Sequence, residues 1–353
     1  MTESSTGLTR KAATPRRAWW PVALALALIT LAGLFAIGDL KKFLAVASDV
    51  QPLWLVAAIG VTGLAYLSFT GALWYAARLC GFPRSYREIL PTSFVSQAVN
   101  NLLSSGGLGG LAIRLYGLGQ LGIPAGSAAA VSGVATLSND VVGAVGLLGA
   151  VVYIINHSED LSTRALYTLL ALAATVAVLI AGMAIALRSP PIRARILGFI
   201  GKYAERIAQK FAQRGAGGVV AGSFREDLLH TFERAIAAPR KLFVPLLFMT
   251  TDLALRSVCL WAAFLAIGHP QPLRRVTAGF LIGISAGALS LVPGGIGVLD
   301  GSMAAVFSYL GVELEVAAVA VIVFRLAYYV VPLGAVAIFF RPLLRRRARE
   351  EVA

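Results

Sequence analysis

The chain has 353 residues, of which 58% are hydrophobic and 14% charged, and its mean hydropathy is +0.78. A soluble domain carries about 25% charged residues, so this composition excludes two soluble domains, a disordered chain and a collagen-like chain. The formal net charge of +14 lies beside the apolar runs rather than in a nucleic-acid-binding module, so nucleic acid is not expected as a partner. Recurring runs of eighteen or more nearly uncharged residues predict a polytopic membrane protein.

Six apolar runs are long enough to cross a bilayer. A basic tail, residues 1–18, precedes the first run, which is longer than the apolar core of a signal peptide and leads into further spans. We therefore interpret it as a transmembrane helix. The six predicted complete crossings are residues 19–37, 53–77, 126–155, 165–187, 241–267 and 316–340.

Two intervals are apolar but interrupted. Residues 90–104 and 108–121 flank a glycine-rich break, and residues 276–292 and 297–310 flank a second break at Pro293-Gly294-Gly295-Ile296-Gly297. Fifteen helical residues reach about 22 Å, short of a hydrocarbon core of roughly 30 Å. We therefore predict re-entrant helical hairpins at residues 90–121 and 276–310. The alternative is two tilted complete crossings in each interval.

The distribution of Lys and Arg predicts the orientation. Residues 1–17, 78–90, 188–241 and 341–353 hold 23 of them, whereas the loops 38–52, 156–164 and 268–275 hold 5. The positive-inside rule then places both termini in the cytoplasm. Arg274 and Arg275 run against this trend, since they lie in a predicted external loop.

The two halves of the chain share an order of elements. Residues 53–155 and 241–340 each read as a span, a hairpin and a span, and similar short motifs recur at offsets of 187, 188 and 189 residues. By the predicted orientation, the two hairpins enter from opposite sides, so the repeats are inverted, as in secondary transporters. The span 165–187 and a basic cytoplasmic linker, residues 188–240, lie between the repeats. The spacing of apolar residues in the linker predicts two amphipathic helices, and the second one carries Phe224, Leu228 and Phe232.

Polar side chains form stripes at helical spacing within the apolar runs. Such stripes either join neighbouring helices or line a substrate path. The first stripe comprises Ser93, Gln97, Asn100 and Ser104, and the second comprises Ser132, Thr136, Asn139 and Asp140.

Six ionisable residues lie at membrane depth, where each one needs a partner or a function. They are Arg114, Asp140, Asp252, Arg256, Asp300 and Arg325. Asp252 and Arg256 have the spacing of a local ion pair, and Asp300 has the position of an N-terminal helix cap. Arg114 and Arg325 have no carboxylate within reach on their own segments. Either they pair with Asp140 or Asp300 across the bundle, or they hold an anion such as a lipid phosphate, beside the N–H groups of the glycine breaks.

Three stretches of the second half carry a family resemblance: residues 292–300 (Val-Pro-Gly-Gly-Ile-Gly-Val-Leu-Asp), 310–312 (Leu-Gly-Val) and 324–333 (Phe-Arg-Leu-Ala-Tyr-Tyr-Val-Val-Pro-Leu). Over about residues 20–340 the chain resembles the lysylphosphatidylglycerol synthase transmembrane-domain family, the flippase-like half of the bacterial multiple-peptide-resistance factor. In the first half, Asn101, Gly106, Arg114 and Asp140 fall where the family has its asparagine, glycine break, arginine and acid. The chain departs from the family at residues 105–109, where a proline-glycine-arginine run is usual, and at Asp300, where glutamate is more common.

The resemblance implies movement of an anionic, aminoacylated or lipid-linked phospholipid between leaflets of a bacterial inner membrane. We expect this chain to lack the family's fused synthase domain, and no catalytic or metal-ligand set is evident in the sequence, so we expect neither an enzyme nor a cofactor. Cys80 and Cys259 read as buried thiols. The alternative functions are a membrane subunit that presents a lipid carrier to a separate transferase, and a small-anion transporter. The sequence leaves open whether the chain forms a homodimer. The predicted substrate site comprises Asn100, Asn101, Gly106, Gly107, Arg114, Asp140, Pro293, Gly294, Gly295, Gly297, Asp300, Arg325, Tyr328 and Tyr329.

Overall fold

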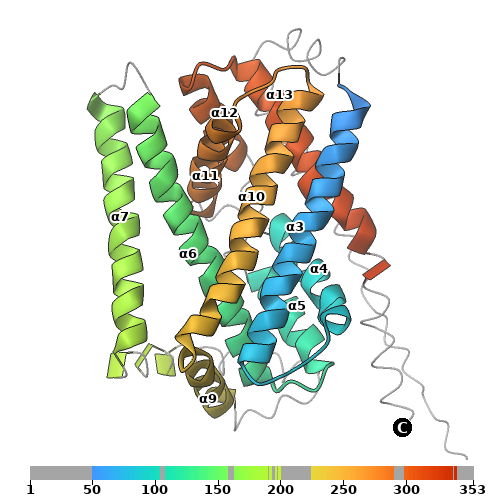
Figure 1. The fold of residues 1–353 in the computed structure, drawn as a ribbon, viewed down its shortest axis with the longest axis vertical. Helices are drawn as coiled ribbons and strands as arrows, with labels where there is room; N and C mark the ends of the chain where they lie inside the picture. Colours follow the sequence, from blue (N-terminus) through green and yellow to red (C-terminus); the bar gives the residue numbers. More distant parts are fainter. Residues whose placement is uncertain are drawn as a thin grey trace, which may run out of the picture.

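The computed structural model describes residues 50–103, 108–157, 163–189, 191–192, 195–196, 198–199, 224–289, 298–336 and 338–339. These residues form helices and turns without a strand, which confirms an all-α protein (Figure 1). The predicted first crossing, residues 19–37, lies outside the described residues, as does the linker before Phe224 apart from residues 188–189, 191–192, 195–196 and 198–199. So do both glycine-rich breaks, which include the predicted site residues Gly106, Gly107, Pro293, Gly294, Gly295 and Gly297.

Four helical stretches in the described residues are long and apolar enough to cross a membrane: Pro52–Leu79, Ala125–Asn156, Pro239–Ala266 and Leu314–Val336. They correspond to four of the six predicted crossings, so the chain is a helical membrane protein. In the helix numbering they are α3 (Pro52–Leu79), α6 (Ala125–His157), α10 (Phe243–Ala266) with the 3₁₀ turn Pro239–Leu242, and α13 (Leu314–Arg325), which continues into a π-helical segment, Leu326–Val330. The predicted crossing at residues 165–187 is α7 (Thr163–Arg188).

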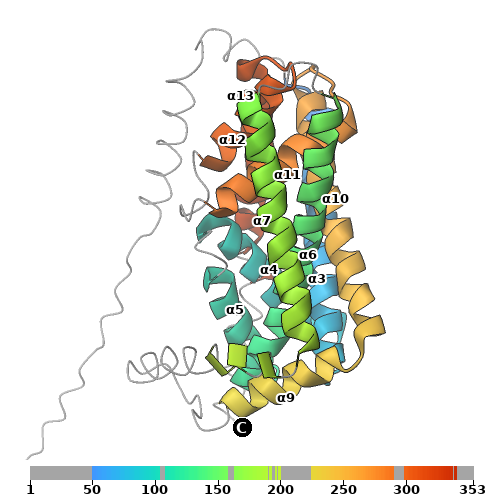
Figure 2. The same ribbon diagram turned by 90° about the vertical axis from the view of Figure 1, so that its left-hand side faces the viewer.

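Two pairs of shorter helices occupy the predicted hairpin intervals. They are α4 (Tyr86–Leu103) with α5 (Leu108–Gly119), and α11 (Leu273–Leu289) with α12 (Val298–Tyr309). In both ribbon views, α4 and α5 lie in the lower half of the molecule and α11 and α12 in the upper half (Figures 1 and 2). Each pair therefore connects at its outer ends to one end of the bundle.

The helix ends explain why the same short motifs recur along the chain. Four glycines in the described residues have a positive φ, and each follows a helix that ends at the bundle surface: α3, α5, α10 and α12. Glycine is favoured there because it tolerates the left-handed conformation that closes a helix. The next residue in each case donates its N–H back into the last turn, as in Phe82 to Ala77, Ile123 to Leu118, His269 to Phe264 and Val312 to Phe307.

The centre of the bundle is an antiparallel pair formed by α3 and α10. Contacts run in opposite directions along the two helices: Gln51 N–H donates to the Ala266 carbonyl at 2.6 Å, and Ser68 Oγ donates to the Phe248 carbonyl at 2.8 Å. Between them, Cys259 Sγ lies 3.5 Å from the Ala58 carbonyl oxygen. Close approach needs small residues, and a Cβ at Gly71 would lie only 2.5 Å from the Phe248 ring. The first half of the protein, α3 to α6, is thereby joined to the second half, α10 to α13.

The second predicted linker helix is α9 (Phe224–Ile236), which lies across the lower end of the bundle (Figure 2). It buries Phe224, Leu228 and Phe232, as its amphipathic pattern predicts. Its Thr231 hydroxyl lies 2.8 Å from the hydroxyl of Ser127 at the start of α6. The helix also helps to cover Cys80; burial raises the pKa of that thiol to about 12, while the nearby Arg234 opposes the shift.

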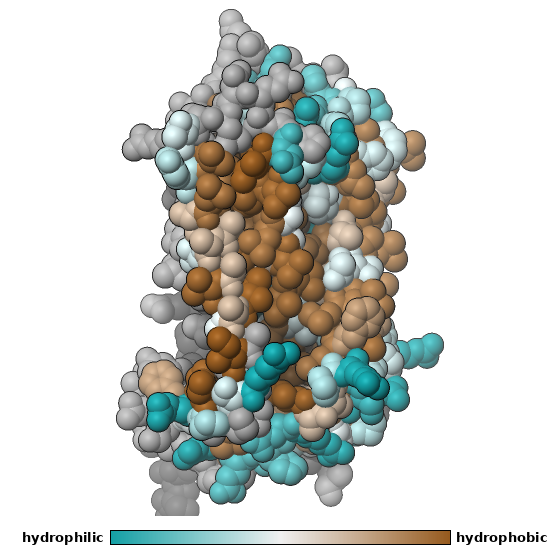
Figure 3. All heavy atoms as spheres, turned by 60° about the vertical axis from the view of Figure 1, so that its left-hand side comes forward, coloured by the Kyte–Doolittle hydropathy of each residue, from teal (hydrophilic) through white to brown (hydrophobic). Residues whose placement is uncertain are grey.

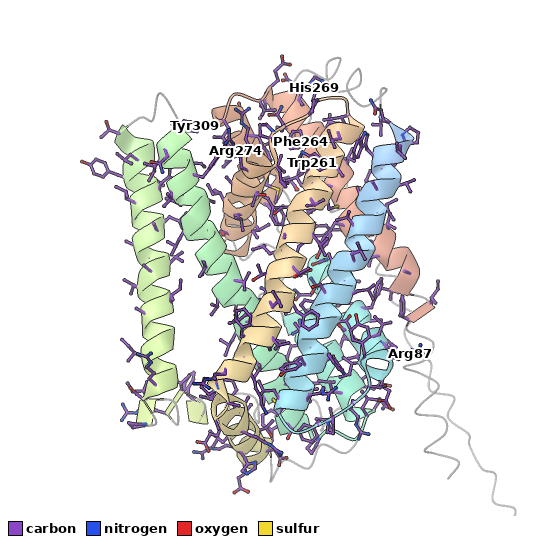
Figure 4. All side chains as sticks on the ribbon, viewed as in Figure 1. Arg87, Trp261, Phe264, His269, Arg274 and Tyr309 are labelled. Atoms are coloured by element: carbon purple, nitrogen blue, oxygen red, sulfur yellow. The ribbon has the colours of Figure 1, made fainter. Side chains whose placement is uncertain are left out.

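The surface carries a broad hydrophobic band between two hydrophilic ends (Figure 3). His269, Arg274 and Tyr309 lie at the upper end and Arg87 at the lower end, with Trp261 just inside the upper end (Figure 4). The Trp261 ring packs edge-on against the Trp54 ring, with 6.0 Å between the ring centres, and its indole N–H donates to the Gln271 carbonyl at 3.0 Å. Tryptophan is favoured at a membrane–water interface, where one edge of the ring is wet.

The arrangement of the two short pairs predicts opposite accessibility of corresponding positions. Gly119 ends α5 at the lower end and Ser308 lies near the end of α12 at the upper end; both are exposed. In a variant with Cys80 and Cys259 replaced by alanine, we expect Gly119→Cys and Ser308→Cys to react with an impermeant maleimide from opposite sides of sealed vesicles. Reaction of both cysteines from one side would contradict hairpins that open to opposite faces.

Candidate functional site

Arg114 is buried between the first short pair and α6. Its side chain projects from α5 and is 5% exposed. Nε donates to the Ser96 hydroxyl of α4 at 3.3 Å, Nη1 donates to the Thr136 hydroxyl of α6 at 3.2 Å, and the guanidinium lies 5.1 Å from the centre of the Phe69 ring. Within the described residues its hydrogen bonds thus go to neutral hydroxyls. Asp140, one turn beyond Thr136, is the acid whose charge acts on it.

Close packing of α4 on α5 places these groups. A Cβ at Gly110 would lie 2.9 Å from both the Ser96 carbonyl oxygen and the Asn100 Cβ, and a Cβ at Gly117 would overlap the Thr92 side chain. The glycines therefore let one face of α4, with Thr92, Ser96 and Asn100, lie directly on α5. Within the described residues, Thr92 Oγ1 and Asn100 Oδ1 are buried without a hydrogen-bond partner.

Asp300 and Arg325 form an ion pair between α12 and α13. Asp300 is 1% exposed and lies in the first turn of α12, as predicted, while Arg325 is 15% exposed at the end of α13. The Arg325 guanidinium also lies 5.2 Å from the centre of the Tyr329 ring. Of the two alternatives for Arg325, pairing across the bundle is the one found in this structure.

The two halves therefore place charges of opposite sign at corresponding positions. In the first half, the second short helix carries the cation Arg114 and the following long helix carries the acid Asp140. In the second half, the second short helix carries the acid Asp300 and the following long helix carries the cation Arg325. The difference lies in how the charges meet: Asp300 and Arg325 are in direct contact, whereas Arg114 contacts α6 through the Thr136 hydroxyl.

A third charged group joins the halves at the centre. Arg256 of α10 forms the predicted local ion pair with Asp252, which is fully buried. Arg256 Nη2 also donates to Asn139 Oδ1 of α6 at 3.2 Å, and Asn139 Nδ2 donates to Asp140 Oδ1 at 3.3 Å. The guanidinium lies 6.0 Å from the centre of the Tyr328 ring. Polar contacts thus run continuously from Asp252 to Asp140.

An aromatic and amide cluster surrounds this centre. Asn101 Nδ2 donates to the Tyr66 hydroxyl at 3.0 Å, and that hydroxyl donates to the Tyr328 carbonyl at 3.4 Å. The Gln97 side chain lies beside the Tyr328 hydroxyl. Tyr328 and Tyr329 both belong to the π-helical segment, a rare geometry that often occurs at functional sites. The segment directs Tyr328 towards Arg256 and Tyr329 towards Arg325.

Thr136 and Asp140 are exposed, although they lie near the middle of a long apolar helix. Asp140 lies about 22 Å along α6 from its first residue. A charged side chain at such depth is costly against lipid and is normally found beside a polar cavity or a wet path. The exposed Thr136 and Asp140 and the buried Arg114 therefore form one group of polar residues at this depth.

Sequence reasoning missed several of the partners. Arg114 contacts Ser96 and Phe69, and Asn101 contacts Tyr66. Each of these three partners lies in an apolar run without a distinguishing pattern. Glycines at 110 and 117 on the facing helix were a usable signal for close packing, since they mark where another helix can approach. The predicted role of the fourteen site residues in binding substrate stays a prediction.

The Asp300–Arg325 contact predicts a specific pattern of stability. Arg325→Gln leaves a buried carboxylate without its cation, and breaking such a pair costs about 3–5 kcal/mol. We expect a marked fall in the thermal unfolding temperature in detergent, with Arg87→Gln, an exposed arginine, as the unaffected control. Adding Asp300→Asn to Arg325→Gln should recover most of the loss. A double variant no more stable than Arg325→Gln alone would contradict the pairing.

Comparison with known proteins agrees with a membrane protein. A UPF0104 membrane protein of Methanothermobacter thermautotrophicus is 27% identical over 290 residues, which cover 78% of this chain and 81% of the relative. A second UPF0104 membrane protein of that organism is 25% identical over 134 residues, covering 36% of this chain and 38% of the relative. Residues 19–335 match the family described as Lysylphosphatidylglycerol synthase TM region. This chain is therefore a member of the lysylphosphatidylglycerol synthase transmembrane family, as the motifs of its second half predict.

Proposed function

We propose that this protein moves a phospholipid or lipid-linked molecule with an anionic head group between the two leaflets. The observation that carries the proposal is the buried Arg114 beside the exposed Thr136 and Asp140, at the middle of a membrane-spanning helix. Nε and Nη1 of Arg114 bind hydroxyls, which leaves further N–H groups for phosphate oxygens. Guanidinium–phosphate contacts are strong and directional.

The head group would lie in this polar region while its acyl chains stay in the lipid. A phosphate that binds Arg114 replaces the attraction of Asp140 and the weak acceptors Ser96 and Thr136. In the second half, the charge of Arg325 is already neutralised by its ion pair with Asp300. Arg114 therefore has the larger role in recognition, and Arg325 the larger role in holding the second hairpin.

We further propose that residues 53–155 and 241–340 are inverted repeats with re-entrant hairpins at 90–121 and 276–310. The antiparallel α3–α10 pair, the glycine-closed helix ends and the opposite placement of the short helices support this arrangement. Rocking of one repeat against the other would expose the polar region to each leaflet in turn. The Lys and Arg distribution favours cytoplasmic termini in a bacterial inner membrane, with α9 on the cytoplasmic side.

Lipid translocation by the purified protein in liposomes tests the proposal. Wild-type protein should move a labelled anionic phospholipid between leaflets. Arg114→Gln should slow it about 10- to 150-fold, because hydrogen bonds to a charged group contribute about 1.5–3 kcal/mol. Arg87→Gln, which removes an exposed arginine at the lower end, should keep the wild-type rate.

The controls separate the proposal from its alternatives. Thermal unfolding of each variant checks that a lost rate is not a lost fold. Wild-type transport by a folded Arg114→Gln variant would discard the phosphate site. A folded wild-type protein that binds lipid without translocating it would favour a subunit that presents lipid to another enzyme, and transport of free phosphate alone would favour a small-anion transporter.

A further inference from the structure

The Asn139 side chain lies between two charged groups that come from different halves of the protein. Its Nδ2 donates to Asp140 Oδ1 at 3.3 Å, and its Oδ1 accepts from Arg256 Nη2 at 3.2 Å. A carboxylate can only accept hydrogen bonds and a guanidinium can only donate them. The two partners therefore determine which way the amide faces, and the amide joins α6 of the first half to α10 of the second.

This orientation depends on the charge of Asp140. A protonated carboxyl group carries an O–H that can donate to Asn139 Oδ1, and its remaining oxygen is a weaker acceptor for the amide nitrogen. If the amide turns to accept that hydrogen bond, its Nδ2 faces Arg256, and two donors then oppose each other. Binding of one proton to Asp140 would thus remove the hydrogen bond between α6 and α10, while the Asp252–Arg256 ion pair on α10 remains.

The charged groups around Asp140 allow its carboxyl group to gain or lose a proton. Among the described residues, Arg114 of α5 is the cation that acts on it, and the hydrogen bonds of Arg114 go to Ser96 and Thr136. From α10, Arg256 and Asp252 reach it through Asn139. The other described charged residues on helices packed against α6 lie near helix ends or on α9: Arg78, Arg164, Arg188, Arg225, Glu226, Asp227, His230, Glu233, Arg234, Arg274 and Arg275. Asp140 is exposed at the protein surface, so other side chains do not close off its carboxyl group.

We propose that Asp140 is the binding site of a coupling proton, whose arrival releases the Asn139–Arg256 contact between the two halves. The proposal rests on the proposed function, since it supplies the driving force for lipid movement. The proton binds from the aqueous phase on one side and leaves to the other, so the step needs no further reactant. With one proton for each lipid, a gradient of one pH unit would sustain about a tenfold ratio of labelled lipid between the leaflets.

Infrared spectroscopy and transport together test the site. In detergent, acidification protonates many of the 17 Asp and Glu side chains, so beside their common C=O stretch the wild-type protein should show a distinct, higher-frequency C=O band from a protonated carboxyl group at membrane depth. Asp140→Asn should lose it, whereas Asn139→Leu and the exposed Glu313→Gln should keep it. In liposomes, a pH gradient should drive lipid asymmetry with the wild type and with Glu313→Gln. Asp140→Asn should not respond to the gradient, and Asn139→Leu should respond weakly because it binds the proton without the link to Arg256.

The outcomes are separable. A band that persists in folded Asp140→Asn, or a gradient response equal to wild type in that variant, overturns the proton site. A gradient response of Asn139→Leu equal to wild type overturns the amide as the link. If the wild type moves no lipid, the proposed function fails, and the infrared result alone decides the site: loss of the band only in Asp140→Asn supports it, and an unchanged band overturns it.

Discussion

The cost of a charge inside the bilayer is the constraint on which the rest of this structure depends. Even on insertion scales, an arginine at the centre of a membrane helix costs about 2.5–3.5 kcal/mol. Three arginines and three aspartates lie at membrane depth in this chain. Arg256 with Asp252, and Arg325 with Asp300, meet that cost by direct pairing. Arg114 meets it with two hydroxyls and an aromatic ring, and Asp140 with an amide, so these two groups are the ones left able to exchange partners.

In each half, a short helix carries one charged group and the following long helix carries the other: Arg114 with Asp140, and Asp300 with Arg325. Glycines allow the short helices to pack closely: Gly110 and Gly117 of α5 receive α4, and Gly279 and Gly287 of α11 lie against Phe307 and Leu299 of α12. Left-handed glycines then close the helices at the bundle ends. The α3–α10 pair holds the two halves together along its length and α6 also packs against α11, while the Asn139–Arg256 contact is a local polar link between the halves. The proposed rocking movement between the halves would break the local Asn139–Arg256 contact.

The lengths of the hydrophobic runs and the positions of the glycines were enough to predict most of the described helices. The spans at 53–77, 126–155, 241–267 and 316–340 and the helix with Phe224, Leu228 and Phe232 are present, and each depends on local pattern alone. The local Asp252–Arg256 pair followed from its spacing. The pairing of Arg325 with Asp300 stayed one of two alternatives, because helices far apart in sequence decide it. Tyr66, Ser96 and Phe69 gave no signal, since a lone hydroxyl or ring in an apolar run looks the same whether it faces lipid or a guanidinium. The π-helical turn that orients Tyr328 and Tyr329 likewise follows from tertiary packing.

Native mass spectrometry of the purified protein tests the central claim most directly, because it identifies what the Arg114 region holds without assuming a transport direction or an energy source. We expect wild-type protein and Arg87→Gln to retain a lipid with an anionic phosphate head group through mild delipidation, and folded Arg114→Gln to lose it. An equal complement of retained lipids in all three proteins, or retention of neutral lipids alone by the wild type, would contradict the account.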